Sequence, residues 1–390
     1  MTTYRRDVES FDVVVVGGGP AGAAAALAAR RHGASVLVLD RSGFPRDKVC
    51  GDGVAPEALD VLAALGVDVD AVTDGYPAVP RLRLTSPSGR TVERTMHRPA
   101  VVVPRAVLDG RVLDAALAAG AQFRRHTVRR VTSGPDGVDV DGVLTAGVLV
   151  GADGAESVVR RALGIAPNRP DRLAIALRGY APAGDPGVQV ITTTEQRWPA
   201  YAWSFPIGDG RANVGYGELV SGGATRAGLL EGLHRLLPGV EPTGLRAHRL
   251  PLSTGRPRLP DGRVLLAGDA QSLINPMTGE GIFYAVLSGA FAGAAAAHGA
   301  DAGRVFRTAL QGRLGTHLRH STVASWVSRW PRVMDAVFAA AHRDQRVFDD
   351  VVALGLADGR LTGRTLLGAG RRLGDPGAVS GGQARAGGDL

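Results

Sequence analysis

The sequence contains very little cysteine and very little lysine. Cys50 is the only cysteine among 390 residues, so no internal disulfide can form, and a reducing, cytoplasmic setting is expected. Lys48 is the only lysine, so 44 of the 45 basic residues are arginine. These arginines are dispersed and not interleaved with aromatic residues. The net charge of +8 therefore does not indicate nucleic-acid binding, and we expect no nucleic-acid partner.

Long apolar runs and metal-ligand patterns are also lacking. No stretch reaches the roughly 18 apolar residues of a membrane-spanning helix, and the closest approach, 285–297, predicts a buried helix rich in Ala and Gly. The nine histidines and the single cysteine lack metal-site spacing, so we predict no metal. With 45% hydrophobic and 21% charged residues, the chain is expected to fold into two or three domains.

A strand–helix–strand pattern stands near the start of the chain. Residues 11–16 (FDVVVV) are apolar on both faces, which is typical of a central parallel strand. Residues 23–32 favour a helix, and residues 34–39 favour a second strand. The pattern predicts a βαβ unit.

The turn of this unit carries the motif G-x-G-x-x-G. Gly17 suits the tight turn, Gly19 lets the backbone approach a pyrophosphate, and Gly22 lets the helix pack on the strand. The helix N-terminus attracts the phosphates. Asp40, 18 positions after Gly22, would accept hydrogen bonds from a ribose. The unit predicts dinucleotide binding but does not identify the dinucleotide.

Two later segments of the chain indicate which dinucleotide is bound. Residues 149–160 read as a strand followed by Gly-Ala-Asp-Gly around Asp153 and a helix start. Residues 262–281 read as a strand followed by Gly268-Asp269 and then by P-x-x-G-x-G. Together with Arg105, which precedes a predicted helix, they resemble the fingerprints of FAD-dependent oxidoreductases that share the aromatic-hydroxylase fold.

This resemblance implies an α/β fold with three parts. They are a Rossmann-like FAD-binding domain of three-layer ββα architecture, an inserted antiparallel β-sheet substrate domain, and a C-terminal helical region. The implied segments are 1–80, 99–170 and 257–299 for FAD binding, 81–98 and 171–256 for the substrate sheet, 300–373 for the helices and 374–390 for a disordered tail.

The same resemblance implies a set of FAD-binding residues. Asp269 would bind the ribityl chain, Asp153 would lie near the pyrophosphate, and the helix after Gly279 would direct its positive end at the flavin pyrimidine. For Arg105 the alternative is an ordinary exposed arginine at a helix start. The full expected set is Gly17, Gly19, Pro20, Ala21, Gly22, Asp40, Arg41, Lys48, Cys50, Gly51, Arg105, Val128, Asp153, Gly268, Asp269, Pro276, Gly279, Gly281 and Ile282.

The only lysine and the only cysteine lie two residues apart. Residues 46–53 read R-x-K-x-C-G-x-G, which resembles the geranylgeranyl reductase family, flavoproteins that saturate isolated prenyl double bonds. In that family the Cys-Gly stretch lies beside the flavin ring. Three interpretations of Cys50 stay open: an inert apolar residue, a residue that shapes the flavin site, and a proton donor or redox thiol. Lys48 and Cys50 are candidate catalytic residues.

A second element of this resemblance is Y-x-W-x-F-P. Tyr201, Trp203 and Phe205 alternate along a predicted strand, so they share one face. We predict that they form the wall of an apolar substrate site, with Tyr201 and Trp203 also as catalytic candidates; core packing is the alternative. The halogenase motif W-x-W-x-I-P is matched only in part, because the first Trp and the Ile are absent.

The leading functional hypothesis is an FAD-dependent reductase of C=C bonds in a prenyl or similar apolar chain, with hydride from reduced flavin N5. The alternatives are a monooxygenase or, less readily, a halogenase acting on a small natural product, and a non-catalytic flavoprotein. Since no second G-x-G-x-x-G exists, NAD(P)H or reduced ferredoxin would act transiently as electron donor. The helices after residue 300, with Trp326, Trp330, Phe338 and Phe348 as periodic apolar points, would pack, cap the cavity or contact a membrane surface.

Overall fold

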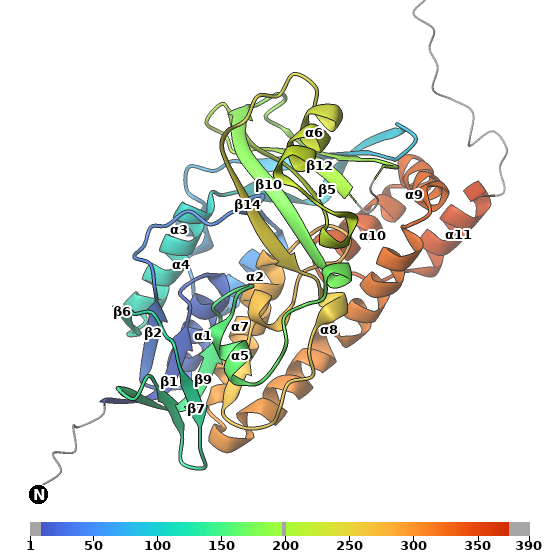
Figure 1. The fold of residues 1–390 in the computed structure, drawn as a ribbon. Helices are drawn as coiled ribbons and strands as arrows, with labels where there is room; N and C mark the ends of the chain where they lie inside the picture. The colour runs from blue at the N-terminus through green and yellow to red at the C-terminus, as the bar shows by residue number, and fades with distance from the viewer. Residues whose placement is uncertain (1–8, 197–199, 374–390) are drawn as a thin grey trace, which may run out of the picture.

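The computed structural model describes residues 9–196 and 200–373. The predicted tail, 374–390, lies outside the described residues. Two sheets are joined by a layer of helices, and further helices extend from one end (Figure 1).

The first sheet has the order β6-β2-β1-β9-β8-β7, with β15 paired to β9. Strands β6, β2, β1, β9 and β15 are parallel, and β7 and β8 continue from β9 as an antiparallel meander. The expected βαβ unit is therefore present. The strands of this first sheet are β1 (Glu9–Val16), β2 (Val36–Asp40), β6 (Gln122–Arg125), β7 (Val131–Ser133), β8 (Val138–Val140), β9 (Leu144–Gly151) and β15 (Val264–Leu266).

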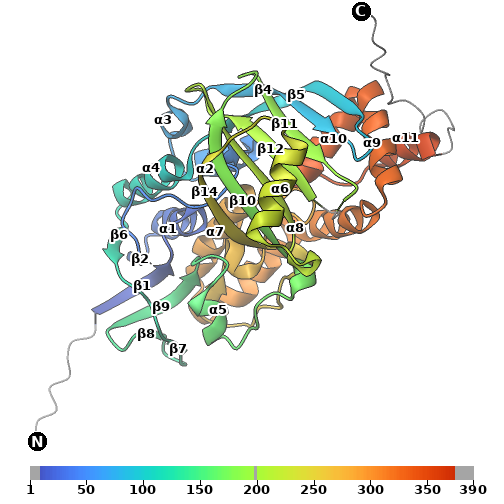
Figure 2. The ribbon, with the colours of Figure 1, turned by 45° about the horizontal axis from the view of Figure 1, so that its top comes forward.

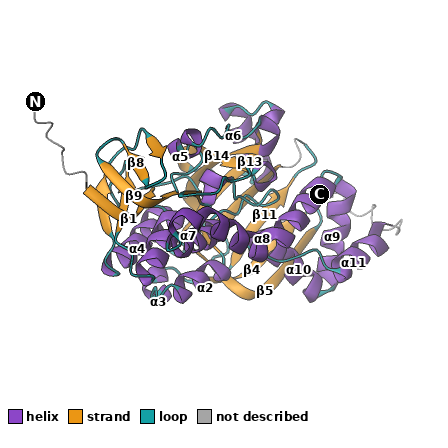
Figure 3. Cartoon of the chain, turned by 90° about the horizontal axis from the view of Figure 1, so that it is seen from below, coloured by secondary structure: helices purple, strands orange, loops and turns teal. Residues whose placement is uncertain are grey.

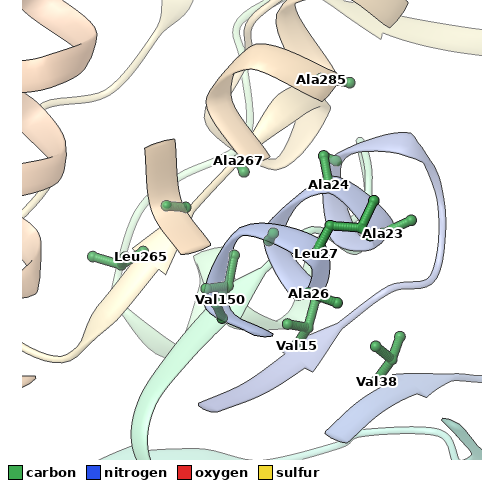
Figure 4. Close-up of a cluster of buried hydrophobic side chains, with 14 of the residues drawn as sticks. Val15, Ala23, Ala24, Ala26, Leu27, Val38, Val150, Leu265, Ala267 and Ala285 are labelled. Carbon is green, nitrogen blue, oxygen red and sulfur yellow. The ribbon is translucent and has the colours of Figure 1, made fainter. Parts of the chain in front are cut away.

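Helices α1 and α7 pack closely against each other beneath this sheet. A Cβ on Gly289 would lie 2.1 Å from the Ala21 carbonyl oxygen, and a Cβ on Gly293 would lie 2.1 Å from that of Ala25. The small-residue run predicted as a buried helix is thus required for this approach. Figure 4 shows buried alanines of α1 together with valines of the neighbouring strands and Ala285 of α7. The helices are α1 (Pro20–Arg31), α2 (Pro56–Ala64), α3 (Val69–Thr73), α4 (Arg105–Ala118), α5 (Val158–Ala162) and α7 (Ile282–Ala296).

The second sheet has eight strands in the order β14-β10-β13-β12-β11-β4-β5-β3. It is antiparallel except between β4 and β11, which come from separate segments of the chain. The segment 81–98, expected to join this sheet, lies within a longer hairpin formed by β4 and β5. The strands are β3 (Gly53–Val54), β4 (Ala78–Thr85), β5 (Thr91–Val102), β10 (Leu173–Pro182), β11 (Val188–Thr193), β12 (Ala200–Pro206), β13 (Arg211–Leu219) and β14 (Thr243–Pro251).

Helix α6 (Arg226–Leu236) interrupts a segment that sequence patterning predicted to be all strand. Its N-cap Thr225 accepts a hydrogen bond from the Gly228 amide at 3.1 Å, and Leu229 and Leu233 pack on Tyr216. The helix covers the face of the sheet that points away from the first sheet, so the strand-only prediction was wrong here.

The C-terminal helices are α8 (Ala302–Val327), α9 (Pro331–Arg343), α10 (Gln345–Leu356) and α11 (Gly363–Leu373). Figure 2 shows α9 and α10 beside β4 and β5, where Phe338 and Phe348 are buried. Figure 3 shows α7 and α8 on the underside of the molecule. Trp326 and Trp330 do not continue this core, because they are 56% and 48% exposed. Within the described residues, no helix is both long and apolar enough to span a membrane.

Candidate functional site

A cavity of about 530 Å³ lies between the carboxyl ends of the parallel strands and the inner face of the second sheet. Segments far apart in sequence meet there, and nearly every residue expected at the site contributes to the wall. Those residues are Gly17, Gly19, Pro20, Ala21, Asp40, Arg41, Lys48, Cys50, Gly51, Arg105, Val128, Asp153, Tyr201, Trp203, Phe205, Asp269, Pro276, Gly279, Gly281 and Ile282.

Two expected residues, Gly22 and Gly268, do not line the cavity. A Cβ on Gly22 would lie 1.7 Å from the Gly17 carbonyl oxygen, so Gly22 serves the packing of helix on turn. Gly268 lies against Ala21 and Ala285, and its amide donates to Ser288 Oγ at 2.9 Å. Both glycines allow close packing of the elements behind the cavity wall. The prediction that they contact the cofactor directly is corrected accordingly.

The glycine turn leaves the N-terminus of α1 open toward the cavity. Gly17 has φ +105°, and a Cβ there would lie 2.3 Å from the Ala152 carbonyl oxygen. The first amides of a helix lack intrahelical partners and favour an anion. Arg46, which the sequence motifs did not indicate as a site residue, lies beside Gly19, 3.4 Å from Gly19's hypothetical Cβ. These features fit a pyrophosphate.

Asp40 supports the glycine turn directly. Its carboxylate accepts hydrogen bonds from the Gly18 amide at 2.8 Å and from the Ser42 amide at 2.9 Å. Each carboxylate oxygen has a second acceptor position, so ribose binding stays available. The acidic residue at the end of β2 thus also orients the turn that holds the phosphates.

Arg105 is not an exposed helix-start arginine, because only 4% of it is exposed. Its Nε and Nη2 atoms donate to the two carboxylate oxygens of Asp109 at 2.6 and 2.8 Å. Such a two-pronged pair holds the guanidinium rigidly at the cavity wall. Asp153 is likewise committed to structure, since it accepts from Ser157 Oγ at 2.5 Å and from the Val158 amide at 2.7 Å.

Lys48 and Asp269 form an ion pair that sequence could not reveal. Lys48 Nζ lies 3.0 Å from Asp269 Oδ2, across 221 residues of chain. Burial by itself raises the pKa of Asp269, but the charge and hydrogen bond of Lys48, together with the charge of Arg105, outweigh burial and hold that pKa below its usual value. The carboxylate proposed to bind the ribityl chain is therefore ionised and has a fixed direction.

Cys50 lies on the cavity wall and is partly buried. Burial raises the pKa of Cys50 despite the nearby Arg105 guanidinium, so the thiol is protonated at neutral pH. This chemistry suits a proton donor or an inert apolar residue better than a thiolate.

The backbone of the Cys50 loop is anchored by Asn213 on β13. Asn213 Nδ2 donates to the Cys50 carbonyl at 2.8 Å and to Asp52 Oδ2 at 2.7 Å. Its Oδ1 accepts from Trp203 Nε1 at 2.9 Å. One fully buried amide thus joins the aromatic strand to the cysteine loop. Asp52 adopts φ +62° and also accepts from Tyr180 Oη at 2.6 Å.

The three aromatic residues of β12 share the cavity face as predicted. The Trp203 indole lies flat on β13, where a Cβ on Gly215 would be 2.2 Å from Trp203 Cζ2. Phe205 lies against Gly51, with a hypothetical Gly51 Cβ 3.5 Å from Phe205 Cε2. Tyr201 donates its hydroxyl to the Thr278 carbonyl. The same face of β12 therefore lines the cavity and also packs against neighbouring strands and loops.

Glu280 lines the cavity, although its motif, P-x-x-G-x-G, indicates only the proline and the glycines as site residues. Burial raises the pKa of Glu280 to about 7. Its Oε1 accepts from the Phe283 amide at 2.8 Å, at the start of α7. A carboxyl group that titrates near neutrality beside Cys50 and Tyr201 can hold or release a proton in this cavity.

The wall as a whole fits FAD. The open helix end with Arg46 and Arg105 matches a pyrophosphate, Asp40 matches a ribose, and the Lys48–Asp269 pair matches the ribityl hydroxyls. The flat indole and the glycines of the Cys50 loop leave space for a planar ring.

Comparison with known proteins gives the same assignment. Residues 10–178 match the family model described as FAD binding domain. A menaquinone reductase from Mycolicibacterium smegmatis is 34% identical over 310 residues, or 72% of this chain and 75% of that protein. Digeranylgeranylglycerophospholipid reductase 1 from Methanopyrus kandleri is 34% identical over 310 residues, or 73% of this chain and 79% of that protein.

A solved structure shares the fold. The geranylgeranyl bacteriochlorophyll reductase-like protein from Thermoplasma acidophilum superposes with a TM-score of 0.77 at 20% identity, over 92% of this chain and 96% of that one. The arrangement of two sheets and C-terminal helices is thus shared with that structure. The chain belongs to the geranylgeranyl reductase family of FAD-dependent oxidoreductases.

Proposed function

We propose that this protein is an FAD-dependent reductase that saturates isolated C=C bonds of a prenyl or similar apolar chain. The observation that supports the proposal is that one part of the cavity wall is apolar and directly adjoins the residues of the flavin motifs. Trp203 and Phe205 lie directly against the Cys50–Gly53 loop, and Ile191, Leu250 and Leu356 extend the wall from other elements. The substrates named for the two relatives are both compounds with prenyl chains.

Saturating one double bond takes a hydride and a proton. Bound in reduced form, FAD supplies the hydride. The proton must come from a donor held beside the alkene, because an isolated alkene has no electron sink of its own. The protonated Cys50 thiol and the Glu280 carboxyl are two groups of the wall that can donate one. The aromatic wall excludes water and holds the alkene against the reacting face.

The test is anaerobic turnover of the FAD-loaded protein with geranylgeraniol, followed by mass spectrometry. Reduced protein should add about two mass units for each double bond saturated, as H₂ addition requires. A parallel incubation in ¹⁸O₂ distinguishes the monooxygenase alternative, which would give ¹⁸O-labelled product. Labelled product, or unchanged substrate with a fully reducible flavin, would refute the reductase assignment for this substrate class.

We also propose that the electron donor binds transiently. The sequence has one G-x-G-x-x-G turn, which the FAD site uses, so NAD(P)H or reduced ferredoxin must react without a Rossmann unit of its own. Anaerobic mixing with NADH, NADPH or reduced ferredoxin should bleach the flavin absorbance with one of the three. Bleaching by dithionite alone would rule out all three donors.

A contact with an anionic membrane surface is a further proposal. Arg319, Val323 and Trp326 share one stripe of α8 at spacings of four and three residues, and all are exposed. Trp330 packs edge-on against Trp326, with ring centroids 4.9 Å apart. Exposed aromatic rings beside arginine suit the headgroup region of a bilayer. The double variant Trp326→Ser, Trp330→Ser should lose co-sedimentation with phosphatidylglycerol vesicles, and unchanged co-sedimentation would oppose the proposal.

A further inference from the structure

Gln189 lies on the cavity face of the second sheet, in its apolar half. On β11, Ile191 pairs with Trp203, so these side chains share a face. Gln189 is two residues from Ile191 and therefore points to the same side, next to Phe205 on the neighbouring strand. Adjacent strands are about 4.8 Å apart. Phe205 in turn lies against Gly51 and Gly53 of the cysteine loop.

The Gln189 side chain is buried without a partner. Only 3% of the residue is exposed, and Nε2 has no hydrogen-bond partner among the described residues. Its neighbours on β11, β12 and β4 are apolar: Ile191, Phe205 and Leu82. An unpaired amide in such surroundings is unfavourable, and buried polar groups of this kind are nearly always paired. The amide nevertheless lines the cavity, where a ligand atom can reach it.

Other unpartnered donors of the cavity do not share this position. Arg178 Nε and His248 Nε2 also lack partners, but they stand on β10 and β14. Strand β14 is separated from β11 by β10, β13 and β12. Arg178 also binds Asp47, and the pKa of His248, lowered to about 4 chiefly by burial, responds to Lys48. Those two groups therefore belong to the cofactor end of the cavity.

We infer that Gln189 is a specificity-determining residue that donates a hydrogen bond to an oxygen atom carried by the substrate close to the double bond. A prenyl chain itself has no acceptor, so a purely hydrocarbon segment would leave the amide unpaired. The substrate class is therefore an oxygenated prenyl compound whose carbonyl or quinone-type oxygen enters the apolar half of the cavity. This inference rests on the proposed reductase function and adds the chemistry of the group attached to the chain.

The test compares two ligands that differ only in the acceptor oxygens: 2-methyl-3-prenyl-1,4-naphthoquinone and 2-methyl-3-prenylnaphthalene. Binding to oxidised FAD-loaded protein is measured by equilibrium dialysis, so no turnover is needed. Wild type should bind the quinone about tenfold more tightly, as one buried hydrogen bond implies. Gln189→Leu should abolish the preference by weakening quinone binding alone. Gln189→Met, which keeps the unbranched shape, serves as a second variant if the first folds poorly.

The matched control is Ile191→Leu, on the same strand face. It alters the apolar wall without a polar atom, so it should change both dissociation constants in the same proportion. A tenfold preference that survives in Gln189→Leu or Gln189→Met, or an absent preference in wild type, would overturn the inference. A protein that shows the Gln189-dependent preference but reduces no double bond would instead refute the proposed reductase function.

Discussion

We call the hydrogen bonds of Asn213 that join β12 to the Cys50 loop the Asn213 junction. Their contribution to the free energy of unfolding can be predicted. Asn213 is fully buried and makes three hydrogen bonds, to the Cys50 carbonyl, Asp52 and Trp203. Replacing it by Leu removes all three at once and leaves the Cys50 carbonyl oxygen and Trp203 Nε1 unpaired, whereas Asp52 Oδ2 keeps the hydrogen bond from the Tyr180 hydroxyl. Each unpaired atom costs roughly 1–3 kcal/mol, but shared neighbours make such costs less than additive. We expect Asn213→Leu to lower the free energy of unfolding by about 3–5 kcal/mol.

A double-mutant cycle isolates one of these bonds. Trp203→Phe removes only the indole N–H and part of the ring, and we expect a cost of about 1–2 kcal/mol. In the double variant the N–H that Asn213→Leu would leave unpaired no longer exists. The double variant should therefore cost less than the sum of the two single changes, by roughly 1 kcal/mol or more.

Urea denaturation followed by circular dichroism measures all four proteins of the cycle. Asn213→Ser, a smaller change, replaces Asn213→Leu if the latter does not fold. Costs that add within about 0.5 kcal/mol would show that Asn213 and Trp203 are independent, which would refute the junction. Flavin content should stay high in Trp203→Phe, since that variant leaves the Cys50 loop anchored.

Three further predictions concern the charged and protic groups of the cavity. Lys48→Met leaves the partly buried Asp269 without its cation, at a cost between the roughly 0–1 kcal/mol of exposed pairs and the roughly 3–5 kcal/mol of buried ones. Because the folded pKa of Asp269 is lowered, this contribution is present at pH 7 and is lost as pH falls through that pKa, so the stability gap to wild type should narrow in acid. A gap that is equal at pH 3 and pH 7 would contradict the pairing. Glu280, with its pKa raised to about 7, keeps its proton on folding, so wild-type stability should decline by at most about 3 kcal/mol from pH 4.5 to 7. Glu280→Gln should remove that slope in pH-dependent urea denaturation, and an unchanged slope would assign it to other groups. Cys50→Ala should keep full flavin occupancy by absorbance and slow double-bond saturation if its thiol donates the proton; unchanged turnover would leave Glu280 as the donor.

Sequence alone was sufficient where local chemistry decides the conformation. The turn around Gly17 and Gly22 and the strand before it follow from backbone sterics and from an apolar run, and both act within about 30 residues. The alternation of Tyr201, Trp203 and Phe205 likewise sets their common face, because the side-chain period of a strand is two.

Only the tertiary structure could reveal which distant groups meet. The Lys48–Asp269 pair spans 221 residues, and the Asn213 bridge to Cys50 spans 163. Nothing in the spacing of those residues indicates a partner, since both contacts depend on how two sheets are placed against each other. The exposure of Trp326 and the burial of Arg105 depend in the same way on which neighbours cover a helix face.

Some properties of the cavity were therefore predictable from the sequence, and others could be seen only in the tertiary structure. Sequence predicted a dinucleotide site at Gly17 and Asp40, because helix dipole and glycine geometry are local properties. The tertiary structure decided that Glu280 titrates near neutrality and that the Gln189 amide faces an apolar space, because desolvation depends on everything packed around a group.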